Sequence, residues 1–403
     1  MKKSEKVKLE DIAEVIDCPH STPKWADEGV FVVRNYNLAS GRIKRDQISC
    51  VDEETYVGRT RRAEPRRGDC ILSREAPIGT VGYINSDERM CLGQRVVLIR
   101  PKDNVDSRYL LYQLISPNVQ NQFKKSVGSG STVSNLRIPL IKSVSIDGID
   151  AHTQEIIGSI LGAYDDLIEN NEKRIKALEE IARLLYVEWF VRFMFPGHEK
   201  VKMIDTGTEY GKVPEGWTVK TLSDVSFEKK EQVNPGEIDQ NTSYVGLEHI
   251  PRKTIVISEW GKASDITSSK KRFQEGDVLF GKIRPYFHKV VIAPVNGITS
   301  SDTIVISALE SKFLGIVLMC ISSDNFVAYA TTTSQGTKMP RAEWKTLKNY
   351  SIIVPADNVL KVFNKNINNW IGEMNKLMIL NQNLAAMRDL LIKALMSEGR
   401  VLK

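Results

Sequence analysis

Short apolar runs separated by glycine, proline and asparagine fill residues 7–148, and the same pattern returns in residues 217–355. Runs of this length that are rich in valine and isoleucine and bounded by turn-forming residues are typical of β-strands. The strands that we expect include 30–33, 70–72, 80–84, 95–99, 278–280, 290–292 and 303–306. The pattern predicts two mixed α/β (α+β) domains of similar size.

Each of these segments is followed by a long stretch with helical periodicity, at residues 151–196 and 356–403. Apolar residues recur there in steps of alternately three and four, with charged residues between them, which is the heptad pattern of a coiled coil. Two seams of similar length in one chain predict an antiparallel pair of helices. The seam residues are Ile157, Leu161, Ile168, Asn171, Ile175, Leu178, Leu185, Ile367, Trp370, Leu377, Asn381, Leu384 and Leu391.

One asparagine lies on each seam, at Asn171 and Asn381. Each is either a tolerated polar residue or, buried between the helices, a residue that fixes their register. Four aromatic residues in 185–193 crowd the end of the first helix. They form either a core where the helix meets a domain or a face that a partner protein covers.

The second half repeats the first. Residues 7–12 resemble residues 219–225, and Gly68-Asp69 before one predicted strand returns as Gly276-Asp277 before another. A repeat this long indicates a duplicated domain with its helix, rather than a solenoid. The predicted boundaries are 1–150 for the first domain, 151–196 for its helix, 197–216 for a linker, 217–355 for the second domain and 356–403 for the second helix.

The composition narrows the class of protein. The 403 residues carry a net charge of +6, which is compatible with a polyanionic partner. The five cysteines are scattered and form no C-x-x-C pair, which favours reduced thiols and argues against a zinc site. No signal peptide and no long apolar run are visible, so we expect a cytoplasmic protein with no membrane segment.

Motifs that would indicate catalysis are missing from the sequence. The histidines are well separated, and neither a glycine-rich dinucleotide or S-adenosylmethionine loop nor a nucleophile elbow occurs. Residues 276–283 approach a P-loop, but they lack the hydroxyl residue that holds magnesium, and their apolar middle predicts a strand. We therefore expect no catalytic residue, no metal and no cofactor in this chain.

Cationic and small polar residues next to predicted strands are the candidates for contact with DNA phosphates and bases. The alternatives are a solvated surface for the basic residues and flexible loops for the small polar ones. The first half supplies Arg59, Arg61, Arg62, Ser73, Arg74, Gly79, Ser129, Ser131 and Thr132. The second half supplies Lys282, Arg284, Tyr286, Ser334, Gln335, Thr337 and Lys338.

The order of these features resembles the specificity subunits of type I restriction-modification systems over essentially the whole chain. The resemblance rests on the repeated opening patterns at 7–12 and 214–222, the two Gly-Asp pairs, the small polar loops and the paired helices. It implies that each α/β domain is a target recognition domain that reads half of a bipartite double-stranded DNA sequence, and that the coiled coil sets the spacer.

The resemblance also implies partners. Two methyltransferase subunits would dock on this chain, flip the target adenine and use S-adenosylmethionine, and restriction subunits join them in complexes that also cleave DNA. One alternative is a subunit of a methylation-only system without a nuclease. Others are a self-contained DNA-modifying enzyme, which would need a cofactor loop or metal-binding carboxylates, and a coiled-coil scaffold, which would not explain the matched basic loops.

Overall fold

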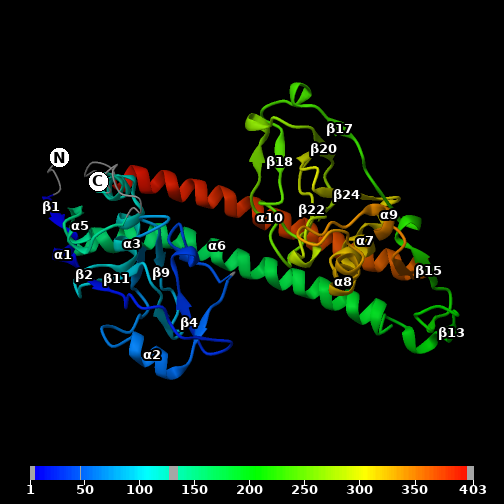
Figure 1. Ribbon diagram of the computed structural model, residues 1–403, viewed down its shortest axis with the longest axis horizontal. Coiled ribbons are helices and arrows are strands. Elements are labelled where there is room, and N and C mark those ends of the chain that lie inside the picture. The colour runs from blue at the N-terminus through cyan, green and yellow to red at the C-terminus, as the bar shows by residue number, and fades with distance from the viewer. Residues whose placement is uncertain (1–4, 46, 127–134, 397–403) are drawn as a thin grey trace. The chain divides into compact units, whose positions relative to one another are not determined.

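The structure is a computed structural model, and it describes residues 5–45, 47–126 and 135–396 (Figure 1). The chain divides into two compact units. The first contains residues 1–168 and 383–403, and the second contains residues 169–382. Both long helices therefore contribute one part to each unit.

The first unit is built around an antiparallel sheet in the order β2-β11-β8-β9. These strands are β2 (Ala13–Asp17), β11 (Val96–Pro101), β8 (Cys70–Ser73) and β9 (Val81–Tyr83). A second sheet has the order β10-β4-β7-β3, with a parallel pair between β10 and β4. Its strands are β10 (Met90–Leu92), β4 (Val30–Val33), β7 (Cys50–Val51) and β3 (Trp25–Ala26).

Strand β11 shows why the apolar runs in this unit are continuous rather than alternating. Val97 and Ile99 lie in one hydrophobic core, whereas Val96 and Leu98 lie in another. Successive side chains of a strand point to opposite faces of the sheet, so both faces of this strand are covered. Apolar residues are therefore needed at consecutive positions.

Helices cover one face of this sheet. They are α3 (Ser107–Ile115), α4 (Pro117–Lys125) and α5 (Ile138–Lys142). Asp106 and Ser116 cap the first two by accepting backbone N–H groups. The remaining elements are α1 (Leu9–Ile12), α2 (Glu53–Arg59), the pair β1 (Glu5–Lys8) and β12 (Ser145–Gly148), and the short pair β5 (Leu38–Ala39) and β6 (Arg42–Ile43).

The second unit repeats this topology. Its central sheet has the order β16-β24-β21-β22, with β16 (Ser226–Glu228), β24 (Thr303–Ala308), β21 (Val278–Gly281) and β22 (Val290–Ile292). Strands β15 (Thr218–Thr221) and β25 (Ser351–Val354) pair as β1 and β12 do. The helices that follow are α7 (Leu314–Ile321), α8 (Asp324–Thr332) and α9 (Trp344–Leu347).

The second sheet of this unit has one strand more than its counterpart, in the order β17-β20-β23-β18-β19. Its strands are β17 (Gln232–Val233), β20 (Lys270–Phe273), β23 (Gly297–Thr299), β18 (Ser243–Val245) and β19 (Gly261–Lys262). The pair β18 and β23 is parallel, like β4 and β10. The duplication expected from the sequence is thus a duplication of topology.

The long helices are α6 (Ala151–Tyr186) and α10 (Asp357–Met396), seen as the two longest ribbons in Figure 1. In the second unit, Asn171 donates a hydrogen bond to Asn381 at 2.8 Å and Arg174 pairs with Glu373 at 3.0 Å. As residue numbers rise on α6 they fall on α10, so the helices pair in an antiparallel manner. Every seam residue predicted above is buried or half-buried.

The end of the first helix differs from the expectation. The α-helix ends at Tyr186, and a π-helical turn continues over Val187–Val191. In this π-helical turn, Trp189 and Phe190 lie in the core and pack against Phe363 of α10. Both are nearly fully buried, so these rings are core residues and not a docking face.

The segment 197–216, expected to be a linker, contains a β-hairpin of β13 (Met203–Asp205) and β14 (Lys212–Pro214). Its turn is closed by Thr206, whose hydroxyl donates to the carbonyl of Gly211. The alternation of apolar and polar residues in such short strands is a weak sequence signal, because several glycines in the segment indicate a loop instead. Among the described residues, no single helix is long and apolar enough to cross a membrane; only α7 and α8 together, bent by 68°, pass that test.

Candidate nucleic-acid interface

The repeated Gly-Asp pairs build the turns that enter the central strands. Gly68 and Gly276 have φ angles of +94° and +88°, a region that favours glycine. Asp69 accepts a hydrogen bond from the backbone of Arg66 at 2.9 Å, and Asp277 accepts one from Gln274 at 2.7 Å. These motifs are therefore structural. They form the turns before β8 and β21, and the loops with the candidate DNA-contacting residues follow these strands.

The residues directly after these strands, Arg74 and Lys282, occupy equivalent backbone positions. The Arg74 N–H donates to the carbonyl of Arg95 at 2.8 Å, and the Lys282 N–H donates to that of Asp302 at 2.9 Å. On the other side, the carbonyl of Arg74 accepts from Leu136, as that of Lys282 accepts from Ala342, both at 2.9 Å. Each unit thus presents a cationic residue from the same place in its sheet.

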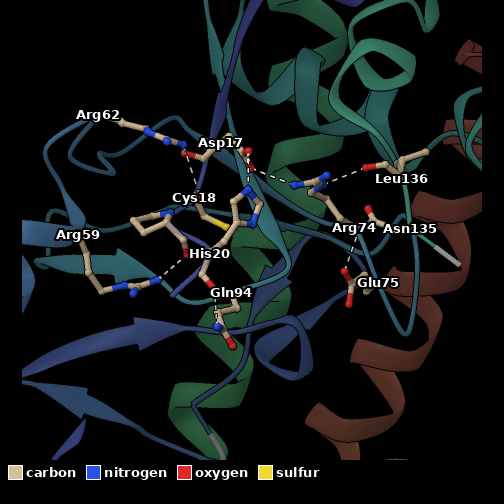
Figure 2. A network of polar contacts seen from close by, with 11 residues as sticks. Asp17, Cys18, His20, Arg59, Arg62, Arg74, Glu75, Gln94, Asn135 and Leu136 are labelled. Atoms are coloured by element: carbon tan, nitrogen blue, oxygen red, sulfur yellow. Dashed lines mark hydrogen bonds and ion pairs between the residues drawn. The ribbon is translucent and has the colours of Figure 1, made fainter. Parts of the chain in front are cut away.

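The side chain of Arg74 is used internally. It is 9% exposed, and Figure 2 shows it between Asp17 and the carbonyl of Leu136. Its Nε donates to that carbonyl at 2.9 Å and its Nη1 to Asp17 at 3.0 Å. A guanidinium held in this way is a structural group, so we no longer assign base contact to Arg74.

Lys282 is half-exposed, and its amino group makes no hydrogen bond or ion pair with the residues that the structure describes. The loop that follows is held by two residues in left-handed conformation, Arg284 with φ +47° and His288 with φ +51°. Between them, the ring of Tyr286 is 51% exposed. An exposed ring close in sequence to Lys282 and Arg284 is a suitable surface for nucleic-acid bases and phosphates.

The two candidate segments of the second unit come together. The Arg284 N–H donates to the carbonyl of Pro340 at 2.8 Å, and the backbones of Gln335 and Arg341 exchange hydrogen bonds. This pairing folds residues 334–341 into a loop beside residues 282–284. Three of the predicted residues in that loop are exposed, namely Gln335, Thr337 and Lys338, and Ser334 is half-buried.

The corresponding loop of the first unit falls on residues 127–134, so Ser129, Ser131 and Thr132 lie outside the described residues. Two further candidates of this unit shape the turn after β8. The hydroxyl of Ser73, fully buried, donates to the carbonyl of Glu75 at 2.7 Å. Gly79 has a φ of +79° and closes the turn through its N–H on the carbonyl of Ser73.

The basic run at 59–62 divides into different roles. Arg59 is 7% exposed and donates to the carbonyls of Leu92, Ser21 and Pro19 at 2.8 to 3.1 Å, so we withdraw it as a phosphate ligand. Arg62 is exposed and donates to the carbonyl of Asp17 at 3.2 Å. Arg61 is exposed without such a bond among the described residues and keeps its predicted role.

Sequence reasoning missed the residues that surround these loops. In the first unit, Glu75 accepts from Asn135 and pairs with Arg95, both at 3.1 Å. In the second unit, the guanidinium of Arg252 lies 4.0 Å from the ring centre of Phe287. These groups come from separate parts of the chain, and only the fold brings them together.

One group of metal-ligating side chains occurs in the described ranges, formed by Asp17, Cys18 and His20. We do not assign a metal to it. Asp17 already pairs with Arg74 and with His20, each at 3.0 Å. Burial raises the pKa of the Cys18 thiol, which opposes the thiolate that a metal requires.

Comparison with known proteins shows to which family this chain is similar. The family model described as the type I restriction modification DNA specificity domain matches residues 1–180 and 214–369. The MjaIX specificity subunit of Methanocaldococcus jannaschii is 27% identical over 316 residues, which cover 74% of this chain and 69% of that protein. The HindI specificity subunit of Haemophilus influenzae is 22% identical, and the match covers 82% of this chain and 86% of that subunit.

A solved structure shares the fold. The crystal structure of the type I restriction-modification S subunit from M. genitalium matches with a TM-score of 0.56 at 13% identity. The match covers 98% of this chain and 96% of the other. Two mixed domains joined to long paired helices are therefore an arrangement already seen in a solved protein.

Proposed function

Because this chain belongs to the family of type I restriction-modification specificity subunits, we propose that each of its units reads one half of a bipartite DNA site. The observation that carries the proposal is the duplicated loop position. Arg74 and Lys282 directly follow equivalent strands and make the same backbone hydrogen bonds, so each unit presents one candidate DNA-contacting surface. In such a subunit the chain recognises DNA and leaves catalysis to its partners.

The second unit gives this surface its chemistry. Lys282, Tyr286 and Lys338 come from two segments that the fold holds side by side, and all three are at least partly open to solvent. A lysine donates to a phosphate or to the O6 and N7 atoms of a guanine, and an exposed aromatic ring stacks on a base. In the first unit, Arg61, Arg62 and Asn135 are exposed next to the candidate loops.

We further propose that the antiparallel helices set the spacer between the two half-sites. The supporting observation is the polar contact inside the seam, where Asn171 is 1% exposed and bonds Asn381. This contact opposes sliding, because a shift by one turn would separate the buried amide of Asn171 from Asn381 and leave it in an apolar seam. A pair of helices with a fixed register can serve as a ruler.

Docking of two methyltransferase subunits is also a proposal, and it is supported by a repeat on the outside of the helices. Exposed apolar side chains recur at matching places on α6 and α10, always at the same shift along the chain. The pairs are Ile156 with Val362, Ile181 with Met387, and Leu184 with Leu390, each residue being 38–65% exposed. Each unit carries one member of every pair, which suits two copies of one partner.

In this proposal the methyltransferase subunits bind S-adenosylmethionine and methylate adenine, since the chain itself shows no loop of the kind that binds this cofactor. Restriction subunits would join the same complex in a system that also cleaves DNA. The neighbouring genes decide between that system and one that only methylates.

The ruler is tested by adding one heptad to each helix, which keeps the seam and lengthens the pair by roughly 10 Å. DNA rises about 3.4 Å per base pair. The lengthened chain, assembled with its methyltransferase subunits, should select the same half-sites from random-spacer DNA, separated by about three more base pairs. Selection of the original spacing would exclude the ruler, whereas selection of only one conserved element by the unmodified complex would exclude bipartite reading.

A further inference from the structure

A single carboxylate in the first unit joins the recognition domain to both long helices. Asp165 lies on α6, and its Oδ2 accepts a hydrogen bond from the hydroxyl of Tyr112 on α3 at 2.6 Å. Its Oδ1 accepts from Arg388 on α10 at 2.5 Å, and Arg42 of β6 lies 3.8 Å from the same oxygen. Four elements therefore meet at one side chain.

The partners of Asp165 are largely removed from water. Arg388 is 6% exposed and Tyr112 is 1% exposed, whereas the Asp165 side chain itself is 21% exposed. Burial acts to lower the pKa of Arg388, but the carboxylates of Asp165 and Asp389 together raise it above its usual value. A buried ion pair is stable only in a narrow geometry, because a small displacement leaves charges unpaired in an apolar surrounding.

The second unit joins its domain to the helices through a different carboxylate. Glu179 of α6 accepts a hydrogen bond from the hydroxyl of Thr254 and bonds from the backbone N–H groups of Ile255 and Val256 at 2.8 and 3.3 Å. From α10, Gln382 donates to the carbonyl of Ser258 at 2.7 Å. The segment 254–258 is thus bound to both helices.

The second junction is not a copy of the first. Asp165 contacts only side chains of the recognition domain in the bonds described above, whereas Glu179 contacts one hydroxyl and two backbone N–H groups. Yet each junction brings a carboxylate of α6 together with the recognition domain of its own unit, and α10 supplies a contact in both. Two different sets of residues perform one task, and that task is to hold a domain at a fixed angle on the helix pair.

We propose that Asp165 and Glu179 are positioning residues that fix the orientation of each recognition domain on the helices and so determine how strictly the spacer length is enforced. The inference rests on the proposed reading of a bipartite site. Neither residue faces DNA in this account, so changing either one should leave the preferred bases of both half-sites unchanged. A domain that can pivot would reach half-sites at neighbouring spacings.

The test uses the assembled complex of this chain with its methyltransferase subunits and a DNA library in which two fixed half-sites flank spacers of varied length. The variants are Asp165→Asn and Tyr112→Phe for the first junction and Glu179→Ala for the second. The matched control is Glu373→Gln, because Glu373 pairs with Arg174 between the helices and both side chains are exposed. Thermal unfolding of each complex identifies the variants that keep their fold.

We expect Asp165→Asn to raise the share of spacers one base pair shorter or longer by roughly tenfold, the effect of losing one charge-assisted buried contact. Tyr112→Phe removes only one hydroxyl and should give a smaller increase, and the control should keep the original distribution. Folded junction variants with the original distribution, or altered base preferences in either half-site, would overturn the inference. Failure of the unmodified complex to select a two-part site would instead overturn the proposed function.

Discussion

Arg74 and Lys282 occupy the same place in two copies of one fold, and their side chains do different things. Arg74 is held between Asp17 and the carbonyl of Leu136, whereas the amino group of Lys282 makes no hydrogen bond or ion pair with the described residues. Duplication therefore preserved the backbone of the loop but not the use of its side chain. A cationic residue after a strand indicates where the interface lies, but not which residue contacts DNA.

The largest expected effect concerns stability. Arg74→Ala should lower the free energy of unfolding of the chain by about 2–4 kcal/mol, because it removes one of the two partners of the Asp17 carboxylate and the side-chain donor to the carbonyl of Leu136. Lys282→Ala at the equivalent position should change it by less than about 0.5 kcal/mol. Denaturant unfolding of the two variants measures both values, and equal losses would show that the two side chains are used alike.

The second-largest expected effect is on the affinity of the assembled complex for DNA. Lys282→Ala should weaken binding of the assembled complex by roughly tenfold and should act on one half-site only. Lys282→Arg keeps the charge and should restore most of the binding. The measurement is competition between DNA duplexes with changes in one half-site at a time. The assignment of Lys282 is wrong if the alanine variant binds as well as the unmodified complex.

A smaller expected effect is on the pH dependence of the free energy of unfolding. Burial raises the pKa of Glu179 above its usual range, against the lowering effect of the three hydrogen bonds it accepts. The folded chain then binds more protons than the unfolded chain between the two pKa values, so this contribution to stability is present below the unfolded pKa and is lost as pH rises through the folded one.

Glu179→Gln keeps the accepting oxygen and removes the charge. This variant should therefore lose less stability than the unmodified chain between about pH 4 and neutrality, since an unperturbed glutamate titrates near 4.3. Unfolding midpoints over that range measure the difference, with Glu180→Gln as the control because Glu180 is exposed and pairs with Arg183 on the same helix. Parallel pH profiles for all three proteins would contradict the role given to burial.

The fold was predictable because its signals are local. The apolar run at 303–306 lies within β24, the run at 95–99 lies within β11 apart from Arg95, and the heptad pattern lies within α6 and α10. The π-helical turn at Val187–Val191 was not predictable, because it depends on packing against Phe363, far along the chain. Period alone cannot indicate where a helix meets a core.

The candidate interface was predictable only in part. The repeated order of loops identified residues 282–286 and 334–338 as candidates, but that residues 334–341 lie beside 282–284 became known only from the fold. The burial of Arg59 and Arg74 could not, because it depends on the carbonyls of Pro19, Ser21 and Leu136. A charge in a loop is informative only when its internal partners are known.

Methylation-sensitive sequencing of host DNA with and without the chain tests whether this chain directs methylation to a bipartite site. We expect one motif, made of two short conserved elements around a spacer of fixed length, to carry methylated adenine only when the chain is present. The same motif with Lys282→Ala should show changed tolerance in one element alone. An unchanged methylation pattern after removal of the chain would contradict the account.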